Sequence, residues 1–183
     1  KDISRNRLYE TTNFTKKSDF SNINILEAGS GAGRFTEIIA ETKANVFTFD
    51  FSSAVDANYE NNNRFDNINF FQADILNIPF EDNYFDIVIC LGVIQHTQFP
   101  CDTFCSLAKK IKPGGRLYID VYSKRWHTYL WSKYILRPLT TRLSKELLFK
   151  LIIKLTPKLI PITKFLKLII GKPGMRISPI VEY

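Results

Sequence analysis

An acidic residue followed by alternating glycines is the stretch of this sequence best suited to holding a ligand. Glu27 ends a short apolar run. The glycines that follow it on alternate positions are Gly29, Gly31 and Gly33. Glycine lets the backbone approach a ligand closely, and the helix expected to begin near Arg34 would point free N–H groups at the same place. This pattern predicts a nucleotide-type pocket.

Two aspartates and a histidine follow later apolar runs. Asp50 lies near the end of the run NVFTFDF, Asp74 follows INFFQ, and His96 comes shortly after FDIVICL. In nucleotide-binding α/β folds, an acid after the second strand binds ribose hydroxyls. Histidine is the side chain most often used as a general base. We therefore expect these three side chains to join the glycines in one site.

The elements that must position these residues alternate along the chain. Strands are expected at 25–26, 45–51, 68–72, 85–91 and 116–122, the last one after a sharp turn at 113–115. Helices are expected within 1–21 and at 34–42, 52–60 and 100–110, with Ser52 as the N-cap of the third. Strands that alternate with helices predict an α/β fold with a doubly wound, mainly parallel sheet.

The glycine spacing narrows the choice of nucleotide. Arg34 stands where a dinucleotide-binding turn has its last glycine, and no Gly-Lys-Ser/Thr follows as in a phosphate-binding loop. The pattern E-x-G-x-G-x-G resembles motif I of the class I S-adenosylmethionine-dependent methyltransferases. FDFS, QADILNIPF, FDIVICLGVIQHT and KKIKPGGRLYI resemble later motifs of that family, in the same order. The resemblance covers about residues 20–123 and implies a Rossmann-like methyltransferase fold.

The resemblance also implies S-adenosylmethionine as the cofactor. It assigns Asp50 to the ribose hydroxyls, Asp74 to the adenine amino group, and Phe51 and Ile75 to the two faces of the adenine. Glu27 would lie near the cationic end of the cofactor, directly or through water. The expected cofactor-binding residues are Glu27, Gly29, Ser30, Gly31, Gly33, Asp50, Phe51, Ala73, Asp74, Ile75 and Leu91. Each assignment has a structural alternative. Glu27 would be only an acid at the end of a strand, Asp50 would cap a helix, and Asp74 would cap a turn. The glycines would serve tight packing.

His96 is the leading candidate for a base that removes a proton from an oxygen or nitrogen acceptor. The resemblance places a histidine here in related small-molecule methyltransferases, with Gln95 where a second histidine is frequent. A structural or substrate-shaping His96 is the alternative, and Asp120 and Tyr122 are further candidates. The N-P-P-Y/F signature of amino-directed DNA methyltransferases is absent. We therefore expect a small-molecule, sugar or lipid-linked acceptor and not a nucleic acid.

Charge divides the chain into two parts. Residues 1–123 hold 12 Lys/Arg and 16 Asp/Glu, whereas residues 124–176 hold 13 Lys/Arg against Glu146 alone. We expect 1–123 to form the cofactor-binding core and 124–183 to form a basic helical region of the same domain. We also expect the chain to be incomplete at one or both ends.

The basic region is expected to form helices at 126–136, 143–156 and 162–170, separated by prolines. Lysines recur among its leucines and isoleucines. Three roles fit this pattern: a lid over the acceptor pocket, an anchor to an anionic membrane surface, and an RNA-binding surface. We therefore expect a cytoplasmic protein that can lie at the inner membrane surface.

The cysteines Cys90, Cys101 and Cys105 form no C-x-x-C pair. We expect them to be buried small apolar side chains in a reducing compartment, with no metal site. Two other classes of function fit the fold: a non-catalytic interaction module and a nicotinamide-dependent enzyme. The absence of the last dinucleotide-type glycine argues against the second.

Overall fold

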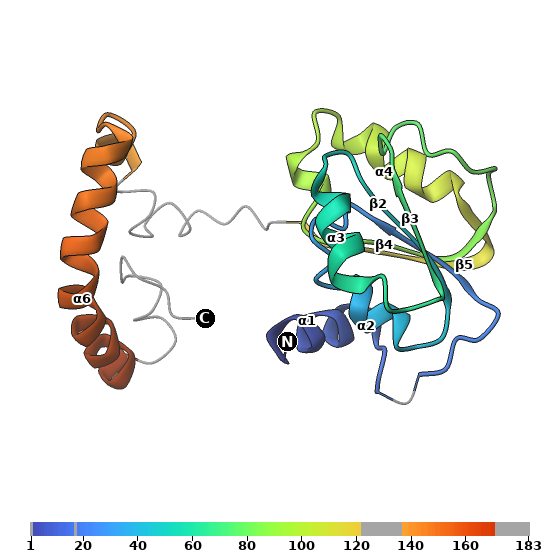
Figure 1. The fold of residues 1–183 in the computed structure, drawn as a ribbon, viewed down its shortest axis with the longest axis horizontal. Coiled ribbons are helices and arrows are strands. Elements are labelled where there is room, and N and C mark those ends of the chain that lie inside the picture. Colours follow the sequence, from blue (N-terminus) through green and yellow to red (C-terminus); the bar gives the residue numbers. More distant parts are fainter. Residues whose placement is uncertain (1, 17, 122–136, 171–183) are drawn as a thin grey trace. The chain divides into compact units, whose positions relative to one another are not determined.

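The computed structural model describes residues 2–16, 18–121 and 137–170. The chain divides into two compact units, Lys1–Tyr122 and Ser123–Tyr183. The first unit contains a five-stranded sheet in the order β3-β2-β1-β4-β5, in which all neighbouring strands are parallel (Figure 1). The strands are β1 (Asn24–Ala28), β2 (Asn45–Asp50), β3 (Ile68–Gln72), β4 (Phe85–Cys90) and β5 (Ile111–Ile119). The predicted doubly wound parallel sheet is confirmed.

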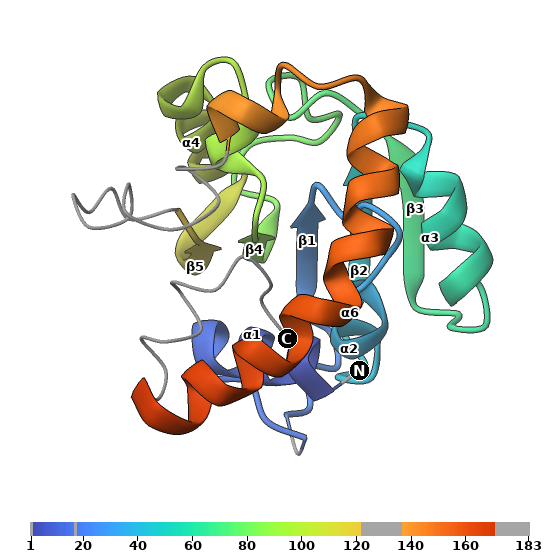
Figure 2. The same ribbon diagram turned by 90° about the vertical axis from the view of Figure 1, so that its left-hand side faces the viewer.

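One helix precedes β1, and others connect β1 to β2, β2 to β3 and β4 to β5. They are α1 (Asp2–Thr12), α2 (Thr36–Ala40), α3 (Ala54–Asn62), the 3₁₀ helix η1 (Ile94–His96) and α4 (Pro100–Lys109). Figure 2 shows α3 beside β3, and α4 near β5. The chain runs outward from β1 to β2 and β3, then returns to place β4 on the other side of β1. Open parallel sheets bind ligands at such a reversal, outside the carboxyl ends of the strands.

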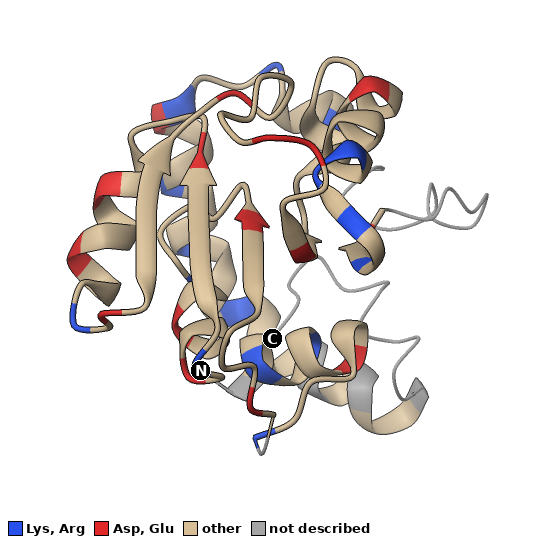
Figure 3. Cartoon of the chain, turned by 90° about the vertical axis from the view of Figure 1, so that its right-hand side faces the viewer, with Lys and Arg blue, Asp and Glu red and all other residues tan. Residues whose placement is uncertain are grey.

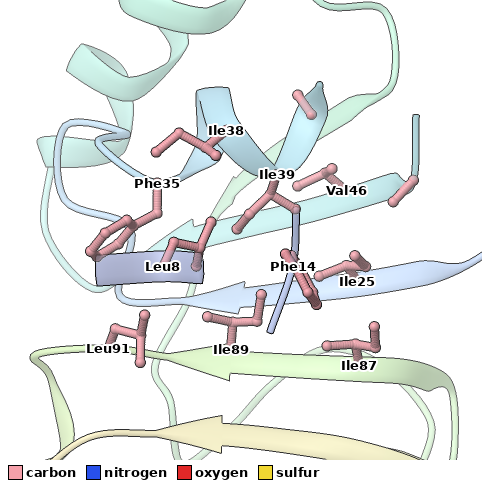
Figure 4. Close-up of a cluster of buried hydrophobic side chains, with 12 residues drawn as sticks. Leu8, Phe14, Ile25, Phe35, Ile38, Ile39, Val46, Ile87, Ile89 and Leu91 are labelled. Atoms are coloured by element: carbon pink, nitrogen blue, oxygen red, sulfur yellow. The ribbon is translucent and has the colours of Figure 1, made fainter. Parts of the chain in front are cut away.

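Two apolar layers enclose the sheet, because successive side chains of a strand point to opposite faces. Ile25 packs in one layer with Leu8 of α1 and Ile39 of α2, as Figure 4 shows. Leu26, the next residue of β1, packs in the other layer with Leu107 of α4. Each such fully buried side chain stabilises the fold by about 1.5–3 kcal/mol. The sheet is therefore a rigid base for the loops at its carboxyl edge.

The expected start of the fifth strand is wrong. β5 begins at Ile111, before the Pro-Gly-Gly turn, and not after it. Its partners in β4 change from Ile111 opposite Phe85 to Arg116 opposite Ile87, so the extra residues form a bulge inside the strand. Bulges of this kind absorb residues that a regular ladder cannot pair.

The expected cap of the third helix and the burial of two cysteines are also wrong. Ser53 occupies the N-cap position of α3 and makes no side-chain cap hydrogen bond. The Ser52 hydroxyl lies one residue earlier, where it donates to Asp50 over 2.7 Å and accepts from the Ala54 N–H over 3.3 Å. Cys90 is buried, but Cys101 and Cys105 are exposed. Because α4 turns its other face, with Thr103 and Leu107, toward the core, the two cysteines face away from it.

The second unit contains the 26-residue helix α6 (Lys145–Ile170). The expected breaks at Pro157 and Pro161 are wrong, because both prolines lie inside this helix. Each proline removes one backbone donor, yet α6 continues through both positions. The expected helix at 126–136 lies outside the described residues. Among the described helices, none has an apolar stretch of the length needed to cross a membrane.

Candidate functional site

A cavity of about 590 Å³ opens at the carboxyl ends of the strands. The last two residues of β2 and the segments that follow β1, β2, β3 and β4, η1 included, form its wall together with one residue of α4. Figure 3 shows acidic residues at the tips of strands in the sheet. The cavity therefore lies where the reversed strand order places a ligand site.

Most of the residues expected to bind a cofactor line this cavity. Those that do are Gly29, Gly31, Asp50, Phe51, Ala73, Asp74 and Ile75. The candidate base, His96, lines it as well. Glu27, Ser30, Gly33 and Leu91 are not among the described lining residues. The fold thus brings the side chains expected to bind the ribose, the adenine and the acceptor to one cavity. Their contact with a ligand stays a prediction.

Hydrogen bonds hold the glycine turn against the end of β2. The N–H groups of Gly29 and Ser30 donate to the carbonyl oxygen of Phe49, over 2.9 and 3.0 Å. The N–H of Gly31 donates to Oδ2 of Asp50 over 2.8 Å. A Cβ atom on Gly31 would meet no atom within 4 Å, and its φ of +53° favours glycine. The backbone at Gly31 therefore leaves open space beside the cavity.

Asp50 presents an ionised carboxylate to the cavity. Its Oδ1 accepts hydrogen bonds from the Ser52 N–H and hydroxyl, over 2.9 and 2.7 Å. Burial raises the pKa of Asp50, but the hydrogen bonds from Ser52 and Gly31 outweigh it and bring the pKa below its ordinary value. A carboxylate accepts about four hydrogen bonds, so a ligand hydroxyl has room on Oδ2.

The side chains expected around an adenine ring lie on neighbouring loops. Phe51 lines the cavity with 74% of its surface exposed, and a flat ligand would cover such a ring. Ile75 lines the same cavity from the loop after β3. Asp74 has a structural role there as well, because its Oδ1 accepts a hydrogen bond from the Leu76 N–H over 2.9 Å.

Glu27 is buried inside the protein, with 3% of its surface exposed. Its Oε2 accepts hydrogen bonds from the hydroxyls of Thr36 and Thr48, over 2.5 and 2.8 Å. Burial raises the pKa of Glu27 to about 7, more than these two hydroxyls lower it. Its Oε1 has no hydrogen-bond partner among the described residues. This oxygen is therefore an unused buried acceptor close to the glycine turn.

The wall near His96 carries uncharged side chains that sequence reasoning missed. The described residues of this part of the wall are Gly92, Val93, Thr97, Gln98, Phe99 and Thr103. Their only sequence signal is their position after the fourth strand, which parallel sheets use for ligands. His96 ends η1 and is the titratable side chain among these lining residues. This end of the cavity suits a neutral, partly apolar molecule.

Asp120, one of the alternative bases, has two partners. It forms an ion pair with Arg7 of α1 and accepts a hydrogen bond from the Gly92 N–H. The pair ties α1 to the edge of the cavity, and its members are too far apart in sequence for a local pattern to reveal it. Tyr122, the other alternative, lies outside the described residues. Within 2–16, 18–121 and 137–170, no group of three or more metal-ligating side chains is present.

Comparison with known proteins assigns the family. A family model described as a methyltransferase domain matches residues 26–119, slightly more than half of the chain. The ubiquinone biosynthesis O-methyltransferase of Coxiella burnetii (strain Dugway 5J108-111) is 29% identical over 111 residues, which cover 59% of this chain and 47% of that protein. The ubiquinone/menaquinone biosynthesis C-methyltransferase of Stutzerimonas stutzeri is 40% identical over 58 residues, which cover 32% and 23%.

A solved structure has the same fold. Phosphoethanolamine N-methyltransferase 1 of Haemonchus contortus, in complex with phosphoethanolamine and S-adenosylhomocysteine, gives a TM-score of 0.58 at 20% identity. The match covers 69% of this chain and 28% of that one. The chain thus spans about half the length, or less, of the relatives it matches. From the family match and the shared fold, this chain belongs to the methyltransferase domain family of the class I S-adenosylmethionine-dependent methyltransferases.

Proposed function

We propose that this protein transfers a methyl group from S-adenosylmethionine to an oxygen or nitrogen atom of a small acceptor molecule. The observation that carries the proposal is the division of the cavity wall. One end combines glycines, two aspartates and an exposed aromatic ring, and the other is uncharged and contains His96. The cofactor, when bound, supplies an electron-poor methyl group on its sulfonium sulfur.

The residues present fit this cofactor in three respects. The open space at Gly31 admits a ligand close to the backbone. The ionised Asp50 has acceptor capacity for a ribose hydroxyl. The unpartnered Oε1 of Glu27 offers a negative or neutral acceptor near the turn, where the ammonium or sulfonium end is expected. Phe51 and Ile75 would enclose the adenine, and Asp74 would accept from its amino group.

The chain's part in the reaction is to place the acceptor and accept its proton. Val93, Phe99 and Thr103 would hold an acceptor of low charge beside the cofactor site. Methyl transfer is an in-line displacement, so fixing the nucleophile behind the methyl carbon removes much of the barrier. His96 would take the proton of an acceptor hydroxyl or amine. Its alternative role, shaping the acceptor pocket without proton transfer, predicts a smaller effect of substitution.

The uncharged end of the cavity supports one choice of acceptor class. The relatives are named for O-, C- and N-methylation, so their names support methyl transfer without selecting the acceptor atom. A neutral wall with one histidine favours a phenol or a similar hydroxylated molecule over a strongly charged one. A lipid-linked acceptor would present the same kind of hydroxylated head group.

Calorimetric titration with S-adenosylmethionine tests the binding part of this proposal. We expect a dissociation constant of roughly micromolar size, with binding lost in Asp50→Ala. Asp56→Ala is the matched control, because Asp56 is an exposed aspartate of the neighbouring helix α3. If the unaltered chain binds no cofactor, the proposed function is wrong.

Turnover is followed as release of S-adenosylhomocysteine with catechol as a phenol and phosphoethanolamine as an amine. We expect turnover with catechol, and His96→Asn should reduce it by about a hundredfold or more if His96 is the base. Cofactor affinity should stay unchanged in that variant. Cofactor binding without turnover on either probe would favour the non-catalytic interaction module.

We further propose that α6 binds the surface of an anionic membrane. Lys150, Lys154 and Lys158 are spaced four apart and share one face of the helix. Large apolar side chains of α6 are exposed, among them Phe149 (64%) and Phe165 (61%). A helix with lysines on one face and exposed apolar groups elsewhere binds at the boundary of head groups and acyl chains.

Sedimentation with phosphatidylglycerol vesicles tests the membrane proposal on the full chain. We expect the unaltered chain to pellet with these vesicles, and the double variant Lys150→Glu with Lys154→Glu to stay in the supernatant. The control is Lys16→Glu with Lys109→Glu, which changes the net charge equally in the first unit. Equal pelleting of both double variants would contradict the proposal, and RNA binding without vesicle binding would favour the RNA-directed alternative.

A further inference from the structure

A chain of buried polar side chains lies between the sheet and α3, next to the glycine turn. Glu27 belongs to β1, Thr36 to α2, Thr48 to β2, and Asn58 and Asn62 to α3. All five are buried, and Asn58 has no exposed surface. Buried polar groups are retained in a fold only where hydrogen bonds satisfy them. Four separate elements therefore depend on one another here.

The hydrogen bonds of this network run in one direction. The hydroxyls of Thr36 and Thr48 both donate to Glu27, so their oxygens are left to accept. Nδ2 of Asn58 donates to both of those oxygens, over 3.0 and 3.3 Å. Oδ1 of Asn58 then accepts from Nδ2 of Asn62 over 2.8 Å. A hydroxyl has one proton, so the acceptor character of Glu27 determines the orientation of the Asn58 amide.

The far end of the network reaches the backbone of the turn. Nδ2 of Asn62 donates to the carbonyl oxygen of Gly33 over 3.1 Å. Gly33 has a φ of +83°, and a Cβ atom there would lie 1.9 Å from Oδ1 of Asn58. No side chain larger than hydrogen fits over that amide. Gly33, which does not line the cavity, is therefore needed for its contact with α3.

We infer that Asn58 is a positioning residue for the cofactor: it links Glu27 to the backbone at Gly33 and thereby holds the Gly29–Gly31 turn at the edge of the cavity. This inference rests on the proposed function, because the turn is taken as the cofactor's binding surface. It adds a residue of α3 that touches neither the cavity nor the expected ligand.

The charge of Glu27 should respond to changes in this network. Asp50, at the end of β2, is the charged group that acts on Glu27, and its charge raises the pKa of Glu27 further. The neighbours from α2, β2 and α3 are the neutral Thr36, Thr48 and Asn58. Asn58→Asp removes both donors and adds a second carboxyl group, so one of the two acids must hold a proton to a higher pH. Thr36→Val removes one of the hydrogen bonds that lower the pKa of Glu27.

Calorimetric titration with S-adenosylmethionine from about pH 6 to about pH 9 tests the inference. In the unaltered chain we expect affinity to fall on acidification, because protonated Glu27 no longer attracts the cationic end of the cofactor. Asn58→Asp and Thr36→Val should weaken binding by about tenfold near neutral pH and move the midpoint of the profile to higher pH. Asn63→Asp, at the exposed C-cap of α3, is the control and should leave the profile unchanged. A loss of affinity at every pH without a shift of the midpoint would overturn the inference.

Hydrogen exchange of the ligand-free protein separates this inference from the proposed function. We expect Asn58→Asp and Thr36→Val to speed exchange at the amides of residues 29–33 and to leave those of 85–90 unchanged. Unchanged exchange at 29–33 would overturn the inference, whatever the cofactor titration shows. Faster exchange there, in a chain that binds no cofactor, would support the structural link and contradict the proposed function alone.

Discussion

Single residues of the glycine turn are required for different reasons, and the reasons can be separated by substitution. Gly31 has a positive φ but open space where a side chain would lie, whereas Gly33 has a positive φ and the Asn58 amide in that space. The same sequence letter therefore serves ligand access at one position and packing at the other. Sequence alone treats both as members of one motif.

Gly31→Val should weaken cofactor binding far more than it destabilises the fold. A side chain at this φ costs about 1–2 kcal/mol, and the added group enters the space beside the cavity. Gly114→Val is a matched control, because Gly114 has a φ of +82° and no neighbour within 4 Å, but lies in the bulge of β5. Thermal unfolding and cofactor titration of both variants check this. Equal loss of affinity in the two variants would contradict the assignment of Gly31.

Glu27 should make the fold less stable as the pH rises. Its pKa is about 7 in the folded chain against an ordinary value of 4.5, with burial as the main cause. The stabilisation from the protonated form is therefore complete below about pH 4.5 and is lost as the pH rises through about 7. The shift corresponds to roughly 3 kcal/mol.

The variant Glu27→Gln should remove this pH dependence. Urea unfolding at about pH 5 and about pH 8.5 measures it. We expect the free energy of unfolding of the unaltered chain, relative to that of Glu27→Gln, to be lower at the higher pH than at the lower one. An unchanged difference would mean that Glu27 keeps an ordinary pKa in the folded chain.

At the scale of elements, the prolines of α4 and α6 differ in their place along the helix. Pro100 is at the start of α4, where the missing N–H has no helical partner to lose. Pro157 and Pro161 lie inside α6. The first is compatible with a helix, and the others each remove a backbone hydrogen bond.

Pro161→Ala should therefore slow hydrogen exchange in the middle of α6, whereas Pro100→Ala should not slow it in α4. The restored N–H of residue 161 can donate to the carbonyl of residue 157, and an interior proline costs about 3 kcal/mol relative to alanine. Exchange measured by mass spectrometry on the full chain compares the two helices. Faster or equal exchange in α6 of Pro161→Ala would show that the proline does not limit the stability of this helix.

For the molecule as a whole, the sheet and most of the residues that line the cavity could be predicted from the sequence, because both have local signals. Apolar runs reveal buried strands, and Asp50, Asp74 and His96 lie near or shortly after the ends of such runs. Features that depend on distant pairing could not be found in this way. The bulge of β5 follows from its register with β4, and the Asn58 network follows from the packing of α3 on β1 and β2. The breaks expected at Pro157 and Pro161 were wrong because the rule that proline ends a helix considers only neighbouring residues, whereas α6 continues through both.

The two compact units should respond to different ligands. If the first unit binds the cofactor and α6 binds membranes, S-adenosylhomocysteine should slow exchange at the turn and at Asp50 but leave 145–170 unchanged. Phosphatidylglycerol vesicles should do the reverse, since the exposed apolar groups of α6 would be covered. Hydrogen exchange of the full chain under each condition measures both effects, with neutral phosphatidylcholine vesicles as the control. Slower exchange in α6 on addition of S-adenosylhomocysteine alone would instead assign the helix to a lid over the acceptor pocket, because a membrane anchor has no reason to respond to the cofactor product.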